Sequence, residues 1–251
     1  MRNEDSCSSS RRNEPENRAG GLTLLLVGAT GLVGQAVLRC ALNDGRVARL
    51  IAPTRRPLVP PGIDPGQSRF VNPLVDFDHL PPDAPWWWVD AVVCTLGTTL
   101  ATAGSREAFR RVDHDYVLDV ARLARAHHAQ AFALTSAAGA DSRSRIFYNR
   151  TKGEVEASVA ACGYPSFTVV RPGLIGGERQ ESRPAEFAAK QLVGLLGPLL
   201  PRRFRLNPPG RIARALLEAA VRGEPGRHLI TSDALTDASE RPLGRHPDAC
   251  E

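Results

Sequence analysis

The stretch from residue 22 to residue 42 constrains the fold more than any other part of the chain. It begins with an apolar run at 22–27, which is typical of a strand buried on both faces. Glycines follow at positions 28, 31 and 34, and then comes an apolar segment with a helical pattern. Small residues at this spacing let the backbone turn, approach a pyrophosphate and pack a helix closely on its strand. The segment predicts a dinucleotide-binding strand–loop–helix unit, with an ordinary tight turn as the alternative.

A second constraint comes from lysine, which occurs only twice in 251 residues, while arginine supplies the other basic side chains. One of the two, Lys152, stands four residues after Tyr148. Positions i and i+4 share one face of a helix, so both side chains are expected to reach one site. An ammonium next to a phenol favours the phenolate, which suits a proton-transferring tyrosine. The alternative is a tyrosine that only packs on the helix surface or in the core.

The alternation of strand-like and helix-like segments predicts an α/β fold, a doubly wound parallel sheet of the Rossmann type with a small C-terminal substrate lobe. Residues 1–20 are expected to be a disordered polar segment, 21–232 the NAD(P)-binding domain with 173–225 including the lobe, and 233–251 a polar tail. Further strands are expected at 46–52, 69–75, 90–96, 131–136, 166–171 and 227–231, and helices at 105–127, 184–200 and 208–222 and around Lys152.

Three motifs taken together resemble the short-chain dehydrogenase/reductase superfamily. The glycine loop and the length of the chain are similar to its atypical branch, which includes the Tat-interacting-protein-like proteins and bacterial NAD(P)H-binding relatives. The likeness covers about residues 21–232. The motifs are Gly28-Ala29-Thr30-Gly31-Leu32-Val33-Gly34, Tyr148-x-x-x-Lys152 and Val170-Arg171-Pro172-Gly173-Leu174-Ile175-Gly176.

In an open parallel sheet the ligand lies outside the carboxyl ends of the strands. The resemblance implies that a nicotinamide dinucleotide follows these ends, with Asp76 and Phe77 near the adenine and Pro172-Gly173 near the nicotinamide amide. For Asp76 a simple loop turn is the alternative. The implied cofactor-binding residues are Gly28, Thr30, Gly31, Leu32, Val33, Gly34, Asp76, Phe77, Leu96, Gly97, Thr98, Tyr148, Lys152, Pro172 and Gly173.

Arg55 and Arg56 stand after the second strand, where folds that bind an unphosphorylated ribose usually carry an acidic residue. Arginine binds phosphate in a bidentate manner. These two residues therefore complete the expected cofactor site and predict NADP rather than NAD, with a solvated loop charge as the alternative.

The resemblance also implies a catalytic set of Ser136, Tyr148 and Lys152. Ser136 ends a strand 12 residues before Tyr148 and is expected to hydrogen-bond a substrate carbonyl, whereas Thr135 should point to the opposite face. The expected function is NADP(H)-dependent hydride transfer on a carbonyl or hydroxyl substrate, with Tyr148 as acid and base. An NADP(H)-binding regulatory or scaffold protein without turnover is the alternative, and a sugar-nucleotide epimerase or dehydratase ranks third.

Charge and composition narrow the expected partners. The net charge of +5 comes from scattered arginines, so a small-molecule substrate is favoured over nucleic acid. No CxxC pair is present, and the neighbours in Asp113-His114-Asp115 point in different directions, so no metal site is expected. Trp86-Trp87-Trp88 is interpreted as packing at a loop edge. Without an apolar signal or membrane-spanning run, a cytoplasmic protein is expected, and a homodimer is left open.

Overall fold

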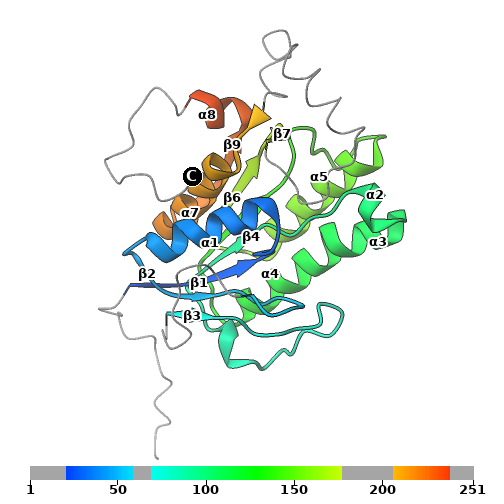
Figure 1. The fold of residues 1–251 in the computed structure, drawn as a ribbon. Coiled ribbons are helices and arrows are strands. Elements are labelled where there is room, and N and C mark those ends of the chain that lie inside the picture. Colours follow the sequence, from blue (N-terminus) through cyan, green and yellow to red (C-terminus); the bar gives the residue numbers. More distant parts are fainter. Residues whose placement is uncertain (1–20, 59–68, 177–205, 238–251) are drawn as a thin grey trace, which may run out of the picture.

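The computed structural model describes residues 21–58, 69–176 and 206–237. Within them, one seven-stranded sheet has the order β3-β2-β1-β4-β5-β6-β9, and every neighbouring pair is parallel (Figure 1). The chain winds outward from β1 to β3 and then crosses to β4, so the switch point lies between β1 and β4. The predicted doubly wound sheet is confirmed. Its strands are β1 (Leu22–Val27), β2 (Val47–Ile51), β3 (Phe70–Val71), β4 (Ala91–Cys94), β5 (Ala131–Thr135), β6 (Ser166–Arg171) and β9 (Gly226–Thr231).

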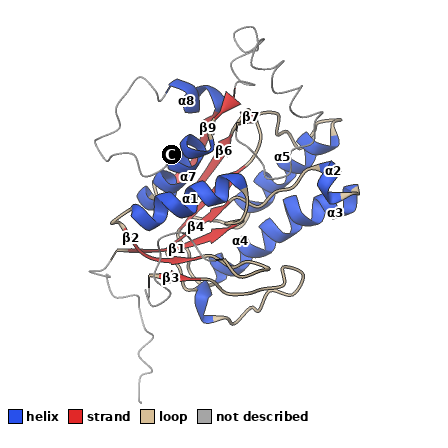
Figure 2. Ribbon diagram, in the orientation of Figure 1, coloured by secondary structure: helices blue, strands red, loops and turns tan. Residues whose placement is uncertain are grey.

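Helices cover both faces of the sheet (Figure 2). Helices α1 (Leu32–Asn43) and α7 (Pro209–Arg222) cover one face, and α4 (Tyr116–Ala126) and α5 (Phe147–Ala160) cover the other. The apolar run of β1 matches this arrangement, because Leu24 and Leu26 enter the first core and Leu25 and Val27 enter the second. All four side chains are fully buried, and each such leucine stabilises the fold by about 1.5–3 kcal/mol.

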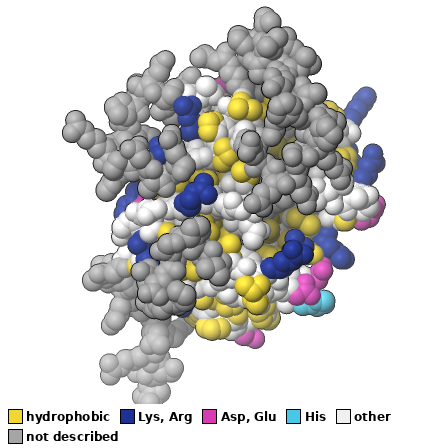
Figure 3. All heavy atoms as spheres, viewed as in Figure 1, with side chains coloured by type: hydrophobic (Ala, Val, Ile, Leu, Met, Phe, Trp, Pro, Cys, Tyr) yellow, Lys and Arg dark blue, Asp and Glu magenta, His cyan; other side chains and the backbone are white. Residues whose placement is uncertain are grey.

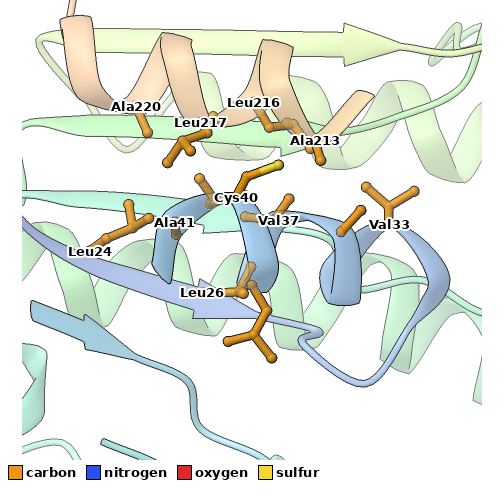
Figure 4. Packing of buried hydrophobic residues seen from close by; sticks show 14 of the residues in the cluster. Leu24, Leu26, Val33, Val37, Cys40, Ala41, Ala213, Leu216, Leu217 and Ala220 are labelled. Atoms are coloured by element: carbon orange, nitrogen blue, oxygen red, sulfur yellow. The ribbon is translucent and has the colours of Figure 1, made fainter. Parts of the chain in front are cut away.

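Close contact between α1 and α7 completes the first core. Figure 4 shows Val33, Val37 and Cys40 of α1 facing Ala213 and Leu216 of α7. Alternating small and large side chains let the two helices interdigitate above the sheet. This packing fixes the direction in which α1 leaves the glycine loop.

The helix expected over 105–127 has a different course. Ser105 caps its start, and its hydroxyl accepts from the Ala108 N–H at 3.1 Å. Helix α3 (Arg106–Arg110) then passes into a π-helical segment, Arg111–Asp115, before α4 begins. A π-turn takes in an extra residue and so changes which side chains face inward. Here it buries Asp113 and His114, which the regular helical pattern did not indicate.

Several smaller elements also differ from the sequence-based expectation. The third strand is only two residues long, although an isolated bridge between Thr54 and Leu74 prolongs its pairing. A short helix, α2 (Leu100–Ala103), was not among the expected elements, and α8 (Ser232–Asp237) occupies the start of the expected polar tail. The helix predicted at 184–200 lies outside the described residues, as does most of the expected substrate lobe. Strands β7 (Leu174–Ile175) and β8 (Leu206–Asn207) pair with each other outside the main sheet.

The tryptophan run forms one turn of 3-10 helix at Pro85–Trp87. Trp87 is fully buried and donates its indole N–H to the Pro81 carbonyl at 2.7 Å, whereas the next residue, Trp88, is 56% exposed. The expected packing role is therefore met by Trp87.

The surface carries its basic side chains at several separate places on the face seen in Figure 3. Among the described residues, every helix falls short of the length and apolar character that a membrane crossing requires.

Candidate functional site

The glycine loop follows β1 at the switch point of the sheet. Gly28 has a φ of 88°, a left-handed conformation that favours glycine. A Cβ on Gly34 would lie 2.0 Å from the Gly28 carbonyl oxygen, so α1 can approach the loop only with glycine there. The Thr95 hydroxyl closes the loop from the β4 side, at 3.0 Å from the Val27 carbonyl oxygen and 3.1 Å from that of Gly28. These two glycines are required by the fold itself.

Gly31 has a different environment. A Cβ there would meet only the Gly28 carbonyl oxygen, at an ordinary contact distance of 3.4 Å. Gly31 is also the N-cap of α1, and no side-chain hydrogen bond caps this helix. The first-turn N–H groups and the positive end of the helix dipole are thus available to an anion. Thr30 is exposed and Leu32 half-buried, whereas Val33 packs in the core and can offer only its backbone.

These features fit a pyrophosphate. The loop provides backbone donors, and the place where the phosphates must approach the chain has room for a side chain but carries none. A loop that served only as a tight turn would need Gly28 and Gly34 but not Gly31.

The segment after β4 lies directly against a buried ion pair. Lys152 Nζ is 2.7 Å from Asp113 Oδ1, and the Thr98 N–H donates to Asp113 Oδ2 at 2.7 Å. A Cβ on Gly97 would lie 3.3 Å from the Asp113 carboxylate and 3.5 Å from the Lys152 ammonium. Gly97 is exposed, and Leu96 and Thr98 are half-buried. The backbone at Gly97 therefore separates the ion pair from solvent, and a larger residue would press on it.

Burial and charge act in opposite directions on Lys152. Burial alone lowers the pKa of its ammonium, but the negative charge of Asp113 and the neighbouring Tyr148 raise it, and the net pKa lies above the ordinary value. The Lys152 side chain is 7% exposed and that of Asp113 is fully buried. Lys152 therefore carries its charge at neutral pH, and its position is set by Asp113.

Tyr148 lies in the first turn of α5, one turn before Lys152, as the spacing predicted. Its ring packs on Phe109, with centroids 5.6 Å apart, and it is half-buried. Within residues 21–58, 69–176 and 206–237, no group is hydrogen-bonded to the Tyr148 hydroxyl. The phenol is therefore held by ring packing while its proton remains available to a ligand.

Ser136 is on the side of the sheet that faces α5. Phe132 and Leu134 enter the core on that side, and alternation along β5 places Ser136 with them. Thr135, the competing residue, lies with Ala131 and Ala133 on the opposite face, and its buried hydroxyl has no partner among the described residues. The sequence-based choice of face is consistent with the structure.

The hydroxyl of Ser136 has a partner that the sequence-based interpretation did not include. It donates to Glu156 Oε1 at 2.5 Å, and Arg171 binds both oxygens of Glu156, at 2.9 and 2.6 Å. A hydroxyl has one proton. In this arrangement Ser136 cannot also donate to a substrate carbonyl, so the donor role predicted for it is not the one seen here.

Pro172 and Gly173 follow β6 at the same edge of the sheet. The Pro172 carbonyl accepts from the Ala138 N–H at 3.0 Å, and the Gly173 N–H donates to Asn207 Oδ1 at 2.7 Å. Asn207 is fully buried and is held in turn by the Ser232 hydroxyl at 2.8 Å. The segment follows β6 as expected for a nicotinamide contact, but the Pro172 carbonyl and the Gly173 N–H are already hydrogen-bonded within the protein.

Arg55 and Arg56 are exposed just beyond β2, and neither forms an ion pair within the described ranges. The hydroxyl of Thr54 donates to the Arg56 carbonyl at 2.6 Å, which shapes this turn. Two free guanidinium groups at a strand end, next to the glycine loop in the sheet order, are well placed for a phosphate.

Asp76 and Phe77 take part in a local turn. The Asp76 carboxylate accepts from the Asp78 N–H at 3.0 Å and bonds His79 Nδ1 at 3.0 Å, which lowers the pKa of Asp76. The Phe77 ring is buried and contacts Tyr116 at 5.6 Å between centroids. This geometry matches the loop-turn alternative, while the exposed Asp76 carboxylate retains lone pairs for a further donor.

Three buried polar residues of the site were missed by sequence reasoning, namely Asp113, Glu156 and Asn207. Glu156 carried a usable signal, because it lies eight residues after Tyr148 and thus on the same face of α5. Asp113 carried none, because the π-turn that turns it inward is not encoded in helical periodicity. Within the described chain, no group of three or more His, Cys, Asp or Glu residues could hold a metal ion.

Comparison with known proteins identifies the family. The chain is 34% identical to the protein HTATIP2 of Rattus norvegicus over 215 residues, which is 85% of this chain and 87% of that one. It is 35% identical to the mitochondrial protein fmp52 of Emericella nidulans over 182 residues, or 68% of this chain and 75% of the relative. No protein-family model matches the chain. The chain belongs to the atypical short-chain dehydrogenases/reductases, as the three motifs predicted.

Solved structures agree on the fold. MoeE5 in complex with UDP-glucose and NAD has a TM-score of 0.62 at 16% identity, over 87% of this chain and 82% of that one. An oxidoreductase of the short-chain dehydrogenase/reductase family from Burkholderia thailandensis has a TM-score of 0.56 at 21% identity, over 86% and 92%. These structures share the Rossmann-like fold of this chain.

The expectation of a cytoplasmic protein is wrong by the same comparison. The fungal relatives at 34–35% identity are named as mitochondrial proteins. The expectation rested on the lack of an apolar signal or membrane-spanning run, and that lack does not decide the compartment.

Proposed function

We propose that this protein is an NADP(H)-dependent oxidoreductase that acts on a carbonyl or hydroxyl substrate. The observation that carries the proposal is the geometry of Tyr148 and Lys152. Both lie on one face of α5, and the charge on Lys152 is close enough to Tyr148 for each to influence the other. Strands β1, β4, β5 and β6 are parallel, so the loops that follow them leave from the same edge of the sheet. The glycine loop is one of these loops, and Tyr148 and Lys152 follow the loop after β5.

In this proposal each residue has a defined task. The bound nicotinamide supplies or accepts the hydride. Tyr148 gives its proton to the carbonyl oxygen during reduction and takes it back during oxidation. Lys152 stabilises the phenolate that remains, and Asp113 keeps the ammonium in place. The glycine loop and the N-terminus of α1 hold the pyrophosphate.

NADP is the proposed cofactor because of Arg55 and Arg56. No acidic residue stands at the end of β2 to accept from a ribose hydroxyl, and the two arginines are exposed and unpaired among the described residues. A phosphate on the ribose would give them a partner.

A cofactor-binding protein without turnover is the second candidate, and the Ser136–Glu156 hydrogen bond favours it. With its proton donated to Glu156, Ser136 does not polarise a carbonyl, so the site has one donor fewer than the sequence implied. MoeE5, whose solved structures contain nucleotide sugars, is 16–17% identical and supports the fold alone.

The test is a cofactor-consumption screen of the purified protein against a panel of carbonyl compounds, with Tyr148→Phe as the control. An enzyme of the proposed kind oxidises NADPH with at least one compound. In Tyr148→Phe, turnover falls by about 10²–10⁴-fold, the contribution of a positioned acid, while the affinity for NADPH holds. Unchanged turnover in Tyr148→Phe would reassign the proton donor. NADPH binding without turnover in either protein would establish the second candidate.

We also propose a mitochondrial location, which rests on the names of the fungal relatives. Fractionation of cells that express the tagged full chain tests it. Recovery with a cytosolic marker would contradict the proposal.

A further inference from the structure

Helix α5 presents three polar side chains along one face. Tyr148, Lys152 and Glu156 are spaced by four residues, and rows of this spacing lie one above the other on a helix. Glu156 is 2% exposed and therefore as deeply buried as the fold core. Its contacts are with Ser136 at the end of β5 and with Arg171 at the end of β6. Glu156 thus belongs to the same strand-end region as the pair that defines the proposed function.

The charge on Glu156 can be read from its partners. Arg171 contacts both carboxylate oxygens, in the bidentate geometry of a guanidinium and an ionised carboxylate. Arg227 adds a second positive charge 3.8 Å from Oε2. Facing two guanidinium groups, the carboxyl is ionised, and an ionised carboxylate only accepts hydrogen bonds.

The direction of the Ser136 hydrogen bond follows. Because Glu156 has no proton to give, the Ser136 hydroxyl must be the donor, and its O–H bond points toward Glu156 Oε1. What Ser136 keeps for a ligand is the lone pairs of its oxygen. A carbonyl oxygen is also only an acceptor, so the two oxygens cannot bond to each other. A hydroxyl or an N–H of the ligand can.

We propose that Glu156 is a positioning residue that turns Ser136 into a hydrogen-bond acceptor, and that the site therefore takes carbonyl compounds with a hydroxyl or N–H donor next to the carbonyl group. The proposal rests on the proposed function for the identity of the reacting carbonyl. Tyr148 donates to the reacting oxygen, and Ser136 accepts from the neighbouring donor. In the oxidative direction the matching substrate is a vicinal diol or an amino alcohol.

Selectivity between two nearly identical ligands gives the sharpest test. Acetoin and butanone differ only in the hydroxyl beside the carbonyl, and so do benzoin and deoxybenzoin. A buried acceptor left without its donor is costly, so within a pair the hydroxy ketone should bind about 10–100-fold more tightly. Dissociation constants are measured by calorimetric titration into the full chain saturated with NADP⁺, which requires no turnover.

The variants separate the positioning role from a merely structural one. Ser136→Ala leaves the Glu156–Arg171 pair intact, and it should reduce the preference within a pair to about onefold. Ser136→Thr keeps the hydroxyl and should keep the preference. In Glu156→Gln the new amide N–H can donate to the Ser136 oxygen, which leaves the Ser136 hydroxyl hydrogen free to donate to a ligand. The preference for the hydroxy ketone should therefore fall or move to the simple ketone. A cooperative unfolding transition is confirmed for each variant.

Each outcome bears on one proposal. Equal affinities within both pairs in the wild type, no binding of either hydroxy ketone, or a preference that survives in Ser136→Ala would overturn the role of Glu156 and Ser136. A preference that behaves as expected, in a protein that consumes no NADPH in the carbonyl screen, would support this inference and refute the proposed oxidoreductase activity.

Discussion

Replacing Asp113 by asparagine should destabilise the protein strongly, because it leaves the Lys152 ammonium buried without a counter-charge. The two groups are 2.7 Å apart, with side-chain exposures of 7% and 0%. Asparagine keeps the size of the side chain and an oxygen that can accept from the Thr98 N–H, so the change removes mainly the charge. Breaking a buried ion pair from one side costs about 3–5 kcal/mol of unfolding free energy. For a domain of this size that corresponds to a fall in Tm of about 6–20 °C.

A double variant shows where the loss originates. Lys152→Met removes the ammonium while keeping an unbranched side chain of similar length. Combined with Asp113→Asn, it should return the unfolding free energy to within about 1–2 kcal/mol of the wild type, since replacing both partners removes the unpaired charge. Urea denaturation of the four proteins at one pH provides the cycle. A loss below about 1 kcal/mol in Asp113→Asn, or a double variant as unstable as the sum of the single ones, would refute a buried, coupled pair.

The pH dependence gives an independent check. In the folded wild type the pKa of Lys152 is raised, because the Asp113 and Tyr148 charges outweigh the lowering by burial. A base with a raised pKa contributes stability that is complete below its unfolded pKa and is lost as pH rises through the folded value. In Asp113→Asn the contributions of Asp113 are lost while burial, the largest influence, remains, so the pKa of Lys152 falls relative to the wild type. The stability gap between the two proteins should therefore be constant near neutral pH and narrow in alkaline solution; a gap that widens there would contradict this sign.

Two further predictions concern the cofactor. Gly31→Val should abolish NADPH binding, because its side chain would fill the place where the pyrophosphate approaches the loop. A cooperative unfolding transition should be retained, since a Cβ at Gly31 meets only one atom, at 3.4 Å. Gly34→Val, in contrast, should prevent folding, because its Cβ would lie 2.0 Å from the Gly28 carbonyl oxygen. Normal NADPH binding by a folded Gly31→Val protein would move the phosphate site elsewhere. In the Arg55→Ala, Arg56→Ala double variant, fluorescence titration should show NADPH binding weakened by about 1.5–3 kcal/mol and NADH binding little changed. Arg49→Ala, an exposed arginine within β2, is the control, and equal affinities for both cofactors in the wild type would contradict the NADP assignment.

The sheet and its switch point could be predicted because they depend on local signals. An apolar run such as 22–27 has few alternatives to a strand buried on both faces, and the core assignments of Leu24 and Leu25 show that it is one. The same holds for the glycine loop, where the spacing of small residues reflects contacts within a dozen positions. Neither prediction depended on contacts between residues that are distant in sequence.

The partners of the polar residues could not be predicted, because they are distant in sequence. Lys152 was expected to serve Tyr148, four residues away, but its ion pair is with Asp113, 39 positions earlier. Ser136 was expected to face a substrate, but its hydroxyl is bonded to Glu156, 20 positions later. A residue type indicates which bonds a side chain can form, and only the packed helices decide which partner it meets.

Taken together, the contacts of α5 leave its tyrosine as the one polar side chain in the row Tyr148, Lys152 and Glu156 that has neither a hydrogen bond nor an ion pair among the described residues. Lys152 is neutralised by Asp113, and Glu156 is neutralised by Arg171, so neither charge has to be balanced by a ligand. Within the described parts of the chain, the Tyr148 hydroxyl has no hydrogen-bond partner. A site that only held a charged ligand would gain from an unpaired charge at this place. A site that exchanges a proton with a neutral carbonyl needs a phenol beside a fixed ammonium, and this is the arrangement of Tyr148 and Lys152. The arrangement therefore favours an enzyme over a protein that only binds a ligand.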